Sequence, residues 1–125
     1  MVNKSIGNKC EQALGKLLQS KGYWCHILEY NKNGQPCDIV AIKGDVSMLI
    51  DVKHCDKDRF NFSRIEANQK ACFEYASSVC GVKNVGFAVY FESDGKFYWL
   101  PFERTKNAVR NCALKSTLVE FENIL

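Results

Sequence analysis

The stretch of sequence that decides the fold is Gln35-Pro36-Cys37-Asp38-Ile39-Val40-Ala41-Ile42-Lys43-Gly44-Asp45-Val46-Ser47-Met48-Leu49-Ile50-Asp51-Val52-Lys53. Two apolar runs, residues 39–42 and 46–50, flank a Lys-Gly-Asp turn, and this pattern predicts a strand, a turn and a second strand. Side chains two residues apart on a strand share a face, so Asp51 and Lys53 are expected to point the same way. The register of the hairpin can bring Asp38 beside them.

This arrangement of charges has a chemical meaning. Two carboxylates supply hard oxygen ligands of the kind that Mg²⁺ prefers. A cation at their side suits a site in which water is activated to attack a phosphodiester. The hairpin therefore predicts a metal site with Asp38 and Asp51 as ligands and Lys53 beside them.

The elements on either side of the hairpin can be placed from periodicity and turn signals. Residues Ser5 to Lys21 carry an apolar stripe at helical spacing, and Gly22 ends it. Residues Tyr23 to Tyr30 read as a strand, and residues 54–62 as a polar, charged loop. A second helix is expected to start at Ser63, where Ser63 and Glu66 form a capping-box pattern, and to end at Gly81.

The rest of the chain predicts a second hairpin and a tail. Val85 to Phe91 and Lys96 to Leu100 read as strands joined through Ser93-Asp94-Gly95. The tail from Lys115 to Leu125 is expected to form an amphipathic helix that covers the sheet or meets a second subunit. The order α-β-β-β-α-β-β predicts an α/β fold with a central mixed sheet flanked by helices. One domain spans residues 1–125, with a core of about 5–104 and a tail of 105–125.

Composition limits the class of protein. The chain has 125 residues, of which 46% are hydrophobic and 25% charged, which is typical of a soluble globular domain. No apolar run is long enough to cross a membrane, and the N-terminus lacks the apolar segment of a signal peptide. Seven cysteines with no Cys-x-x-Cys pair favour reduced thiols in a cytoplasmic protein over disulfides.

Basic residues gather near the hairpin although the net charge is only +3. Lys57, Arg59 and Arg64 follow it and Lys32 precedes it, so these four are candidates for binding DNA phosphates. Phosphate binding depends on such a local field more than on total charge. The alternative is a solvated loop, which for Lys57 alone is the better interpretation.

Two further residues have a functional and a structural interpretation. Glu11 lies at the edge of the first helix's apolar stripe, where it either faces water or points inward as a ligand. Gln69 lies on the apolar face of the second helix and needs a hydrogen-bond partner, either the backbone or the site. His54 is expected on the face opposite Lys53, and His26 is expected to be structural. Neither histidine has the neighbours of a zinc site.

These motifs resemble those of the PD-(D/E)XK nuclease superfamily. Pro36-Cys37-Asp38 is similar to the first half of its motif, and Asp51-Val52-Lys53 to the second. Within the superfamily, the segment 61–69 and the ending 98–103 resemble the small Holliday-junction resolvases of the archaeal Hjc and bacterial RecU types. The resemblance covers roughly residues 7–104, and it implies a restriction-endonuclease-like fold.

The resemblance also implies an activity. It implies hydrolysis of branched DNA to 5′-phosphate ends, with Mg²⁺ or Mn²⁺ held by Asp38, Asp51, the Val52 carbonyl and Glu11. Lys53 and Gln69 would complete the catalytic set, and a homodimer would supply two sites for paired cuts, in the cytoplasm of a cell or a phage-infected cell. Asp51 departs from the glutamate usual in resolvases. The alternatives are a nuclease of phage replication or restriction type and a non-catalytic DNA-binding module.

Overall fold

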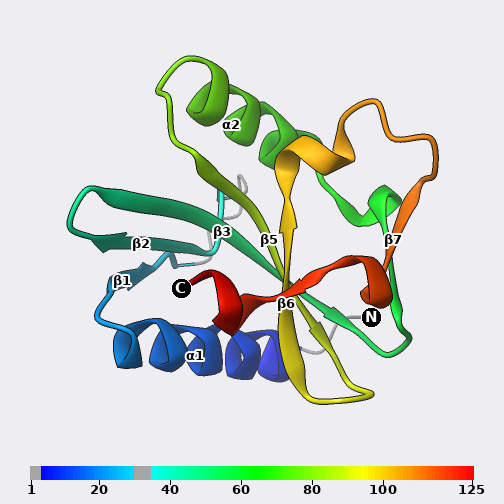
Figure 1. Cartoon of the computed structure of the whole chain (residues 1–125), viewed down its shortest axis with the longest axis horizontal. Helices are drawn as coiled ribbons and strands as arrows, with labels where there is room; N and C mark the ends of the chain where they lie inside the picture. The colour runs from blue at the N-terminus through cyan, green and yellow to red at the C-terminus, as the bar shows by residue number, and fades with distance from the viewer. Residues whose placement is uncertain (1–3, 30–34) are drawn as a thin grey trace.

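The computed structural model describes residues 4–29 and 35–125, and in it the predicted elements form a sheet with a helix on each face (Figure 1). Helix α1 spans Lys4–Ser20 and helix α2 spans Ala67–Ser78. The main strands are β1 (Trp24–Ile27), β2 (Ile39–Lys43), β3 (Val46–Cys55), β5 (Asn84–Phe91), β6 (Lys96–Pro101) and β8 (Val119–Glu120). Two short strands, β4 (Arg59–Asn61) and β7 (Cys112–Leu114), pair with each other.

The six-stranded sheet is mixed, as the sequence predicts. Its strand order is β1-β2-β3-β5-β6-β8. Strands β3 and β5 run parallel, with Asp51 opposite Phe87, and the other neighbouring pairs are antiparallel. A parallel pair needs a crossover connection, and the chain between β3 and β5 supplies it through α2. The α/β fold class with a central mixed sheet is therefore confirmed.

Alternation along β3 divides the core into two clusters. Met48 and Ile50 face α1 and pack with Leu14 and Leu18. The other face carries the cluster around Phe73 of α2, which also receives alternate side chains of β5 and β6. Because successive strand residues point to opposite faces, Asp51 and Lys53 lie on the α2 side of the sheet.

Gly86 allows β5 and β6 to approach closely. A Cβ built at Gly86 would collide with the carbonyl oxygen of Leu100 and lie 3.0 Å from the backbone nitrogen of Phe102. These neighbours are backbone atoms that cannot rotate away, so only glycine fits here.

Two predicted elements next to the motif hairpin differ from the structure. Helix α2 begins at Ala67, and the backbone N–H of Glu66 donates to Gln69 Oε1 (3.2 Å), so the capping pattern at Ser63 is wrong. Phe62–Arg64 instead form a 3-10 turn, η1. The region predicted as the loop 54–62 contains the end of β3 and all of β4.

The predicted tail helix is also wrong. The tail forms β7, the 3-10 turn η3 (Lys115–Thr117), β8 and a final turn η4 (Phe121–Ile124). Strand β8 pairs with β6, so hydrogen bonding to an open sheet edge prevails over the helical spacing of the apolar residues. Phe121 is fully buried and packs edge-on against Trp99, so the tail does cover the sheet.

Two further expectations can be compared with the structure. All seven cysteines lie in the described part of the chain, and none forms a disulfide. Neither of the described helices is long and apolar enough to cross a membrane.

Candidate active site

Asp51 and Lys53 point to the same side of β3 and form an ion pair. Lys53 Nζ lies 3.0 Å from Asp51 Oδ2. Asp51 is 1% exposed, which is unusual for a carboxylate and requires compensating partners. The predicted shared face is confirmed.

Asp38 lies beside this pair, as the register of the hairpin predicts. Its backbone joins the sheet, because its N–H donates to the Ile50 carbonyl (2.9 Å) and its carbonyl accepts from Leu28 N–H (2.9 Å). Its side-chain Oδ2 accepts from the backbone N–H of Val52 at 2.7 Å. The backbone N–H of Val52, which lies between Asp51 and Lys53, therefore holds the Asp38 carboxylate in place.

Gln69 connects the helix to both charged groups of β3. Its Nε2 donates to Asp51 Oδ1 (2.9 Å), and its Oε1 lies 3.4 Å from Lys53 Nζ. The same Oε1 accepts a hydrogen bond from the Glu66 backbone N–H. Gln69 therefore bonds both to the backbone and to the site, which the sequence had offered as alternatives. The Gln69 side chain thus caps α2 and also orients Asp51 and Lys53.

Glu11 approaches the site from α1. It is partly buried, and burial followed by the negative charge of Asp38 raises its pKa to about 7. Among the described residues, however, no group of three or more His, Cys, Asp or Glu side chains has the geometry to hold a metal ion. Ligation of a cation by Asp38, Asp51, Glu11 and the Val52 carbonyl therefore stays a prediction.

The electrostatics of the two aspartates favour a bound cation. Burial first, and then the charge of Asp38, raises the pKa of Asp51 well above its usual range, while Lys53 opposes this rise. Asp51 Oδ2 is buried and has no hydrogen-bond partner, since its contact with Lys53 lacks hydrogen-bond geometry. A buried carboxylate oxygen that is paired with the Lys53 ammonium but accepts no hydrogen bond, next to a second carboxylate, is a suitable donor set for Mg²⁺ or Mn²⁺.

Two residues of the site were not predicted from the sequence. Gln35 Nε2 donates to Asp38 Oδ1 at 2.8 Å. Asn68 Nδ2 donates to the Gln35 carbonyl at 3.2 Å, so adjacent residues of α2 reach both aspartates, Asn68 through Gln35 and Gln69 directly. No motif marks either residue, although a glutamine three positions before Asp38 is a signal that could have been noted.

The predicted DNA-binding residues occupy different environments. Lys57 and Arg59 are exposed near β4. Arg64 is half-buried, donates from Nη1 to the His54 carbonyl (2.8 Å) and lies over the Phe60 ring, while its carbonyl accepts from Lys53 Nζ (3.4 Å). Arg64 therefore has a structural role that its sequence position did not reveal. Lys32 lies outside the described residues.

Both histidines lie away from the aspartates. His54 faces the opposite side of the sheet, where Nε2 lies 2.9 Å from Glu92 Oε1 and the ring stacks on Tyr90. His26 stacks on Trp24 in β1. These positions agree with structural roles.

The fold agrees with that of a known resolvase. No family model matches the chain, and no curated protein matches it by sequence. Among solved structures, the chain is similar to Hjc, a Holliday junction resolvase from the archaeal hyperthermophile Archaeoglobus fulgidus, with a TM-score of 0.75 and 18% identity. The match covers 94% of this chain and 98% of the archaeal one. The predicted restriction-endonuclease-like fold is thus confirmed, since the chain shares the fold of this archaeal protein.

Proposed function

We propose that this protein is a metal-dependent endonuclease that cuts branched DNA, as a Holliday-junction resolvase does. The observation that carries this proposal is the bonded group of Asp38, Asp51, Lys53 and Gln69, which lies where α2 meets the inner strand β3. A DNA-binding protein without activity would have no need to bury two adjacent carboxylates, because their repulsion costs stability unless a cation joins them.

The aspartates are the residues that would hold the metal. When bound by Asp38 and Asp51, Mg²⁺ or Mn²⁺ supplies Lewis-acid polarisation of the scissile phosphate and activation of water. The Val52 carbonyl and Glu11, directly or through water, would complete the ligand set. Gln69 engages Asp51 Oδ1, whereas both oxygens of Asp38 are engaged, Oδ1 by Gln35 and Oδ2 by the Val52 N–H. These donors fix the orientation of both carboxylates, and each engaged oxygen keeps a second lone pair for a cation.

Lys53 acts next to these carboxylates. Its ammonium is held among Asp51 Oδ2, Gln69 Oε1 and the Arg64 carbonyl, at 3.0, 3.4 and 3.4 Å. From this position the ammonium can orient the attacking water and offset the charge that develops on the phosphate. Taking the proton of the water would require the neutral amine form of Lys53. Cleavage in this way leaves 5′-phosphate and 3′-hydroxyl ends.

The DNA and the partner follow from the same proposal. Lys57 and Arg59 are exposed in the chain between β3 and the start of β4 and would contact the phosphate backbone. Paired cuts across a junction need two active sites, so the protein acts as a homodimer. Sedimentation at micromolar concentration tests this, and a strict monomer that cuts junctions symmetrically would contradict it.

A comparison of substrates tests the proposed function. The purified protein is incubated with Mg²⁺ and end-labelled four-way junction, Y-fork or linear duplex of matched sequence. Preferred cleavage of the junction, lost in EDTA, is the expected result. Equal cleavage of all three DNAs would leave a nuclease of another kind, and binding without cleavage would leave a DNA-binding module.

A further inference from the structure

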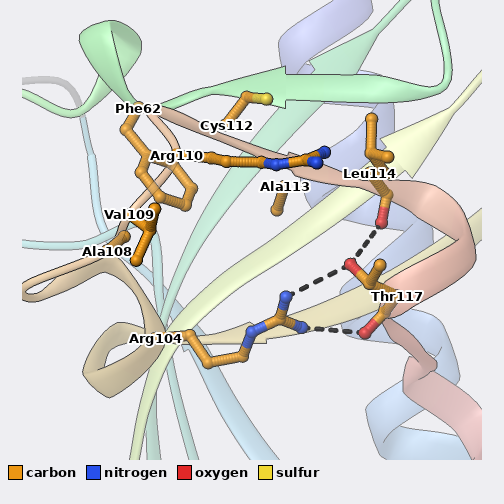
Figure 2. Close-up of a pocket in the computed structure, with 9 residues that line it drawn as sticks. All are labelled: Phe62, Arg104, Ala108, Val109, Arg110, Cys112, Ala113, Leu114 and Thr117. Carbon is orange, nitrogen blue, oxygen red and sulfur yellow. Dashed lines mark hydrogen bonds between the residues drawn. The ribbon is translucent and has the colours of Figure 1, made fainter.

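A pocket of about 300 Å³ lies between β7, the turns η2 (Phe102–Thr105) and η3, and the loop that joins η2 to β7 (Figure 2). The residues that characterise it are Phe62, Arg104, Val109, Arg110, Ala113 and Thr117. In Figure 2 the side chains of Arg104 and Arg110 both extend along the pocket, with Ala113 between them. It is distinct from the candidate active site, whose aspartates do not line it.

The pocket is positively charged. None of the nine described residues that line it is acidic. Arg104 is fixed by neutral acceptors, because it donates to the Thr117 carbonyl (2.8 Å) and to Thr117 Oγ1 (3.2 Å). Within the described residues, no hydrogen bond or ion pair engages the Arg110 guanidinium. Two guanidinium groups with no carboxylate between them suit an anion, above all a phosphate.

A neighbouring pocket shows the contrast. It holds about 400 Å³ on another side of Phe62, and it contains Lys106. There the ammonium of Lys106 is neutralised by Glu74 at 2.7 Å. With Lys70 and Lys106 against Glu74, the lining of that pocket has a formal charge of +1, whereas Arg104 and Arg110 give the first pocket +2 with no acidic residue in its lining.

The remaining lining is apolar and suits a planar group. Phe62, Ala108, Val109 and Ala113 line the pocket together with the two arginines, and the Val109 side chain is fully exposed. Aromatic rings and guanidinium planes are the surfaces on which unpaired bases stack. A phosphate site next to an apolar wall matches a nucleotide, and a volume of about 300 Å³ admits one nucleotide but no base pair.

The pocket is joined to the candidate active site by a single turn. Phe62 lines the pocket and begins η1, and Arg64, which ends η1, accepts a hydrogen bond from Lys53 through its carbonyl. Phe62 is tied to the pocket's other wall, because its N–H donates to the Asn111 carbonyl at 2.8 Å. Since two residues of extended chain span at most about 7 Å, one DNA strand can reach both places.

We propose that this pocket binds one unpaired nucleotide of the branched DNA close to the phosphate that is cut. The phosphate of that nucleotide lies between Arg110 and Arg104, and its base packs against Phe62 and Val109. At a branch point base stacking is interrupted, so opening the base pair next to the branch costs less than opening one inside a continuous duplex, and this opening supplies the unpaired nucleotide. This inference rests on the proposed function and adds to it a site that selects branched over continuous duplex DNA.

The test combines a protein change with a DNA change. Binding is measured in EDTA, so that nothing is cut, with four-way junctions that each carry one abasic residue at successive positions around the branch. The proteins are the wild type, Arg110→Ala and the control Lys16→Ala, which removes an exposed charge from α1. Unfolding curves show whether each variant is folded, and Arg110 has no bond whose loss would unfold the chain.

We expect the abasic residue and Arg110→Ala to remove the same part of the junction affinity, a result called here the shared loss. At one or two positions the missing base weakens wild-type binding about tenfold, as loss of one stacked base does. Arg110→Ala binds the intact junction more weakly than the wild type, and an abasic residue at those positions causes no further loss of its affinity. Its slope of log K against log salt is smaller in magnitude by about 0.7 to 0.9, because one phosphate contact is gone. Lys16→Ala behaves as the wild type.

Two results would overturn the proposal. One is a scan in which no abasic position matters, and the other is an equal abasic effect in wild type and Arg110→Ala. Either result leaves the proposed nuclease function standing, because cleavage in Mg²⁺ is a separate measurement. Conversely, if the protein cut no DNA but showed the shared loss, the nucleotide-binding pocket would be supported and the proposed nuclease function would be wrong.

Discussion

The candidate active site and the β4–β7 region hold their charged side chains in different ways. In the active site, Asp38, Asp51 and Lys53 are each engaged by neighbouring atoms within 3.4 Å. In the β4–β7 region, Lys57, Arg59 and Arg110 are exposed to solvent. Under the proposed function, the first region would act on one phosphate and the second would make less exacting contacts with the rest of the DNA.

The largest expected effect is loss of cleavage on changing the active site. Asp38→Asn, Asp51→Asn and Lys53→Ala should each reduce the cleavage rate roughly 1,000-fold or more, since each removes a group that acts on the reacting phosphate. Single-turnover cleavage of a labelled four-way junction measures this, and gel shifts in EDTA should show that junction binding persists.

Asp45→Asn is the matched control for these variants. Asp45 is an exposed carboxylate in the turn of the same hairpin, so its loss changes the net charge as the two aspartate variants do, without touching the site. Its cleavage rate should equal that of the wild type. Near-normal turnover in any of the three active-site variants would remove the mechanism proposed here.

The second largest effect concerns the tail. Phe121→Ala should lower the free energy of unfolding by about 3 to 5 kcal/mol, because a fully buried ring packed on Trp99 is removed. Urea unfolding measures it. Ile124→Ala in the same turn is the control, and since Ile124 is 36% exposed its cost should be much smaller. Equal costs for the two variants would mean that the tail does not complete the core.

The two regions also differ in how far they could be predicted from the sequence. Asp38, Asp51 and Lys53 belong to one hairpin, so alternation and a short turn were enough to bring them together. The pairing of β4 with β7 joins Arg59 to Leu114, which are distant in sequence, and no local pattern encodes it. The spacing of Leu118 and Phe121 suggested a helix, because local spacing does not show that this part of the chain meets the open edge of β6. There Val119–Glu120 forms the strand β8.

The roles of individual side chains were hardest to predict. Arg64 looked like a DNA-binding residue, but its guanidinium reaches back to the His54 carbonyl, a contact that requires the turn η1. Gln35 carries no motif at all, and it becomes a site residue only because Asn68 fixes its backbone. Such contacts depend on where three separate segments meet in space.

A third prediction compares the two glutamines that support the aspartates. Gln35→Ala should weaken Mg²⁺ binding about tenfold, because Asp38 loses the donor that orients it, whereas excess Mg²⁺ should restore cleavage. Gln69→Ala should weaken Mg²⁺ binding as well and also leave cleavage impaired at saturating Mg²⁺, since Gln69 contacts Lys53 too.

Isothermal titration with Mg²⁺ and cleavage rates over a range of Mg²⁺ concentrations separate these outcomes. Gln19→Ala, an exposed glutamine on α1, is the control and should change neither quantity. If Gln35→Ala kept its full Mg²⁺ affinity, the hydrogen bond to Asp38 would have no role in metal binding.

The smallest expected effect is a pH dependence of stability in the metal-free protein. Burial and the charge of Asp38 raise the pKa of Glu11 from 4.5 to about 7, and the pKa of Asp51 is raised as well. Between pH 4.5 and 7 the folded protein therefore binds more protons than the unfolded chain, so this contribution to stability falls as the pH rises through that range. A cation that neutralises the carboxylates should offset the loss.

Thermal unfolding at pH 5 and pH 8, in EDTA and in Mg²⁺, tests this sign. The wild type should lose up to about 5 °C more than Glu11→Gln between pH 5 and pH 8 in EDTA, because the amide cannot ionise. Mg²⁺ should narrow that difference, since it favours the ionised carboxylates that the metal-free protein resists. If wild type and Glu11→Gln followed the same pH profile in EDTA, Glu11 would not be coupled to Asp38, and its predicted place in the metal site would lose its main support. A difference that persisted unchanged in Mg²⁺ would instead leave Glu11 close to Asp38 but outside the influence of the metal.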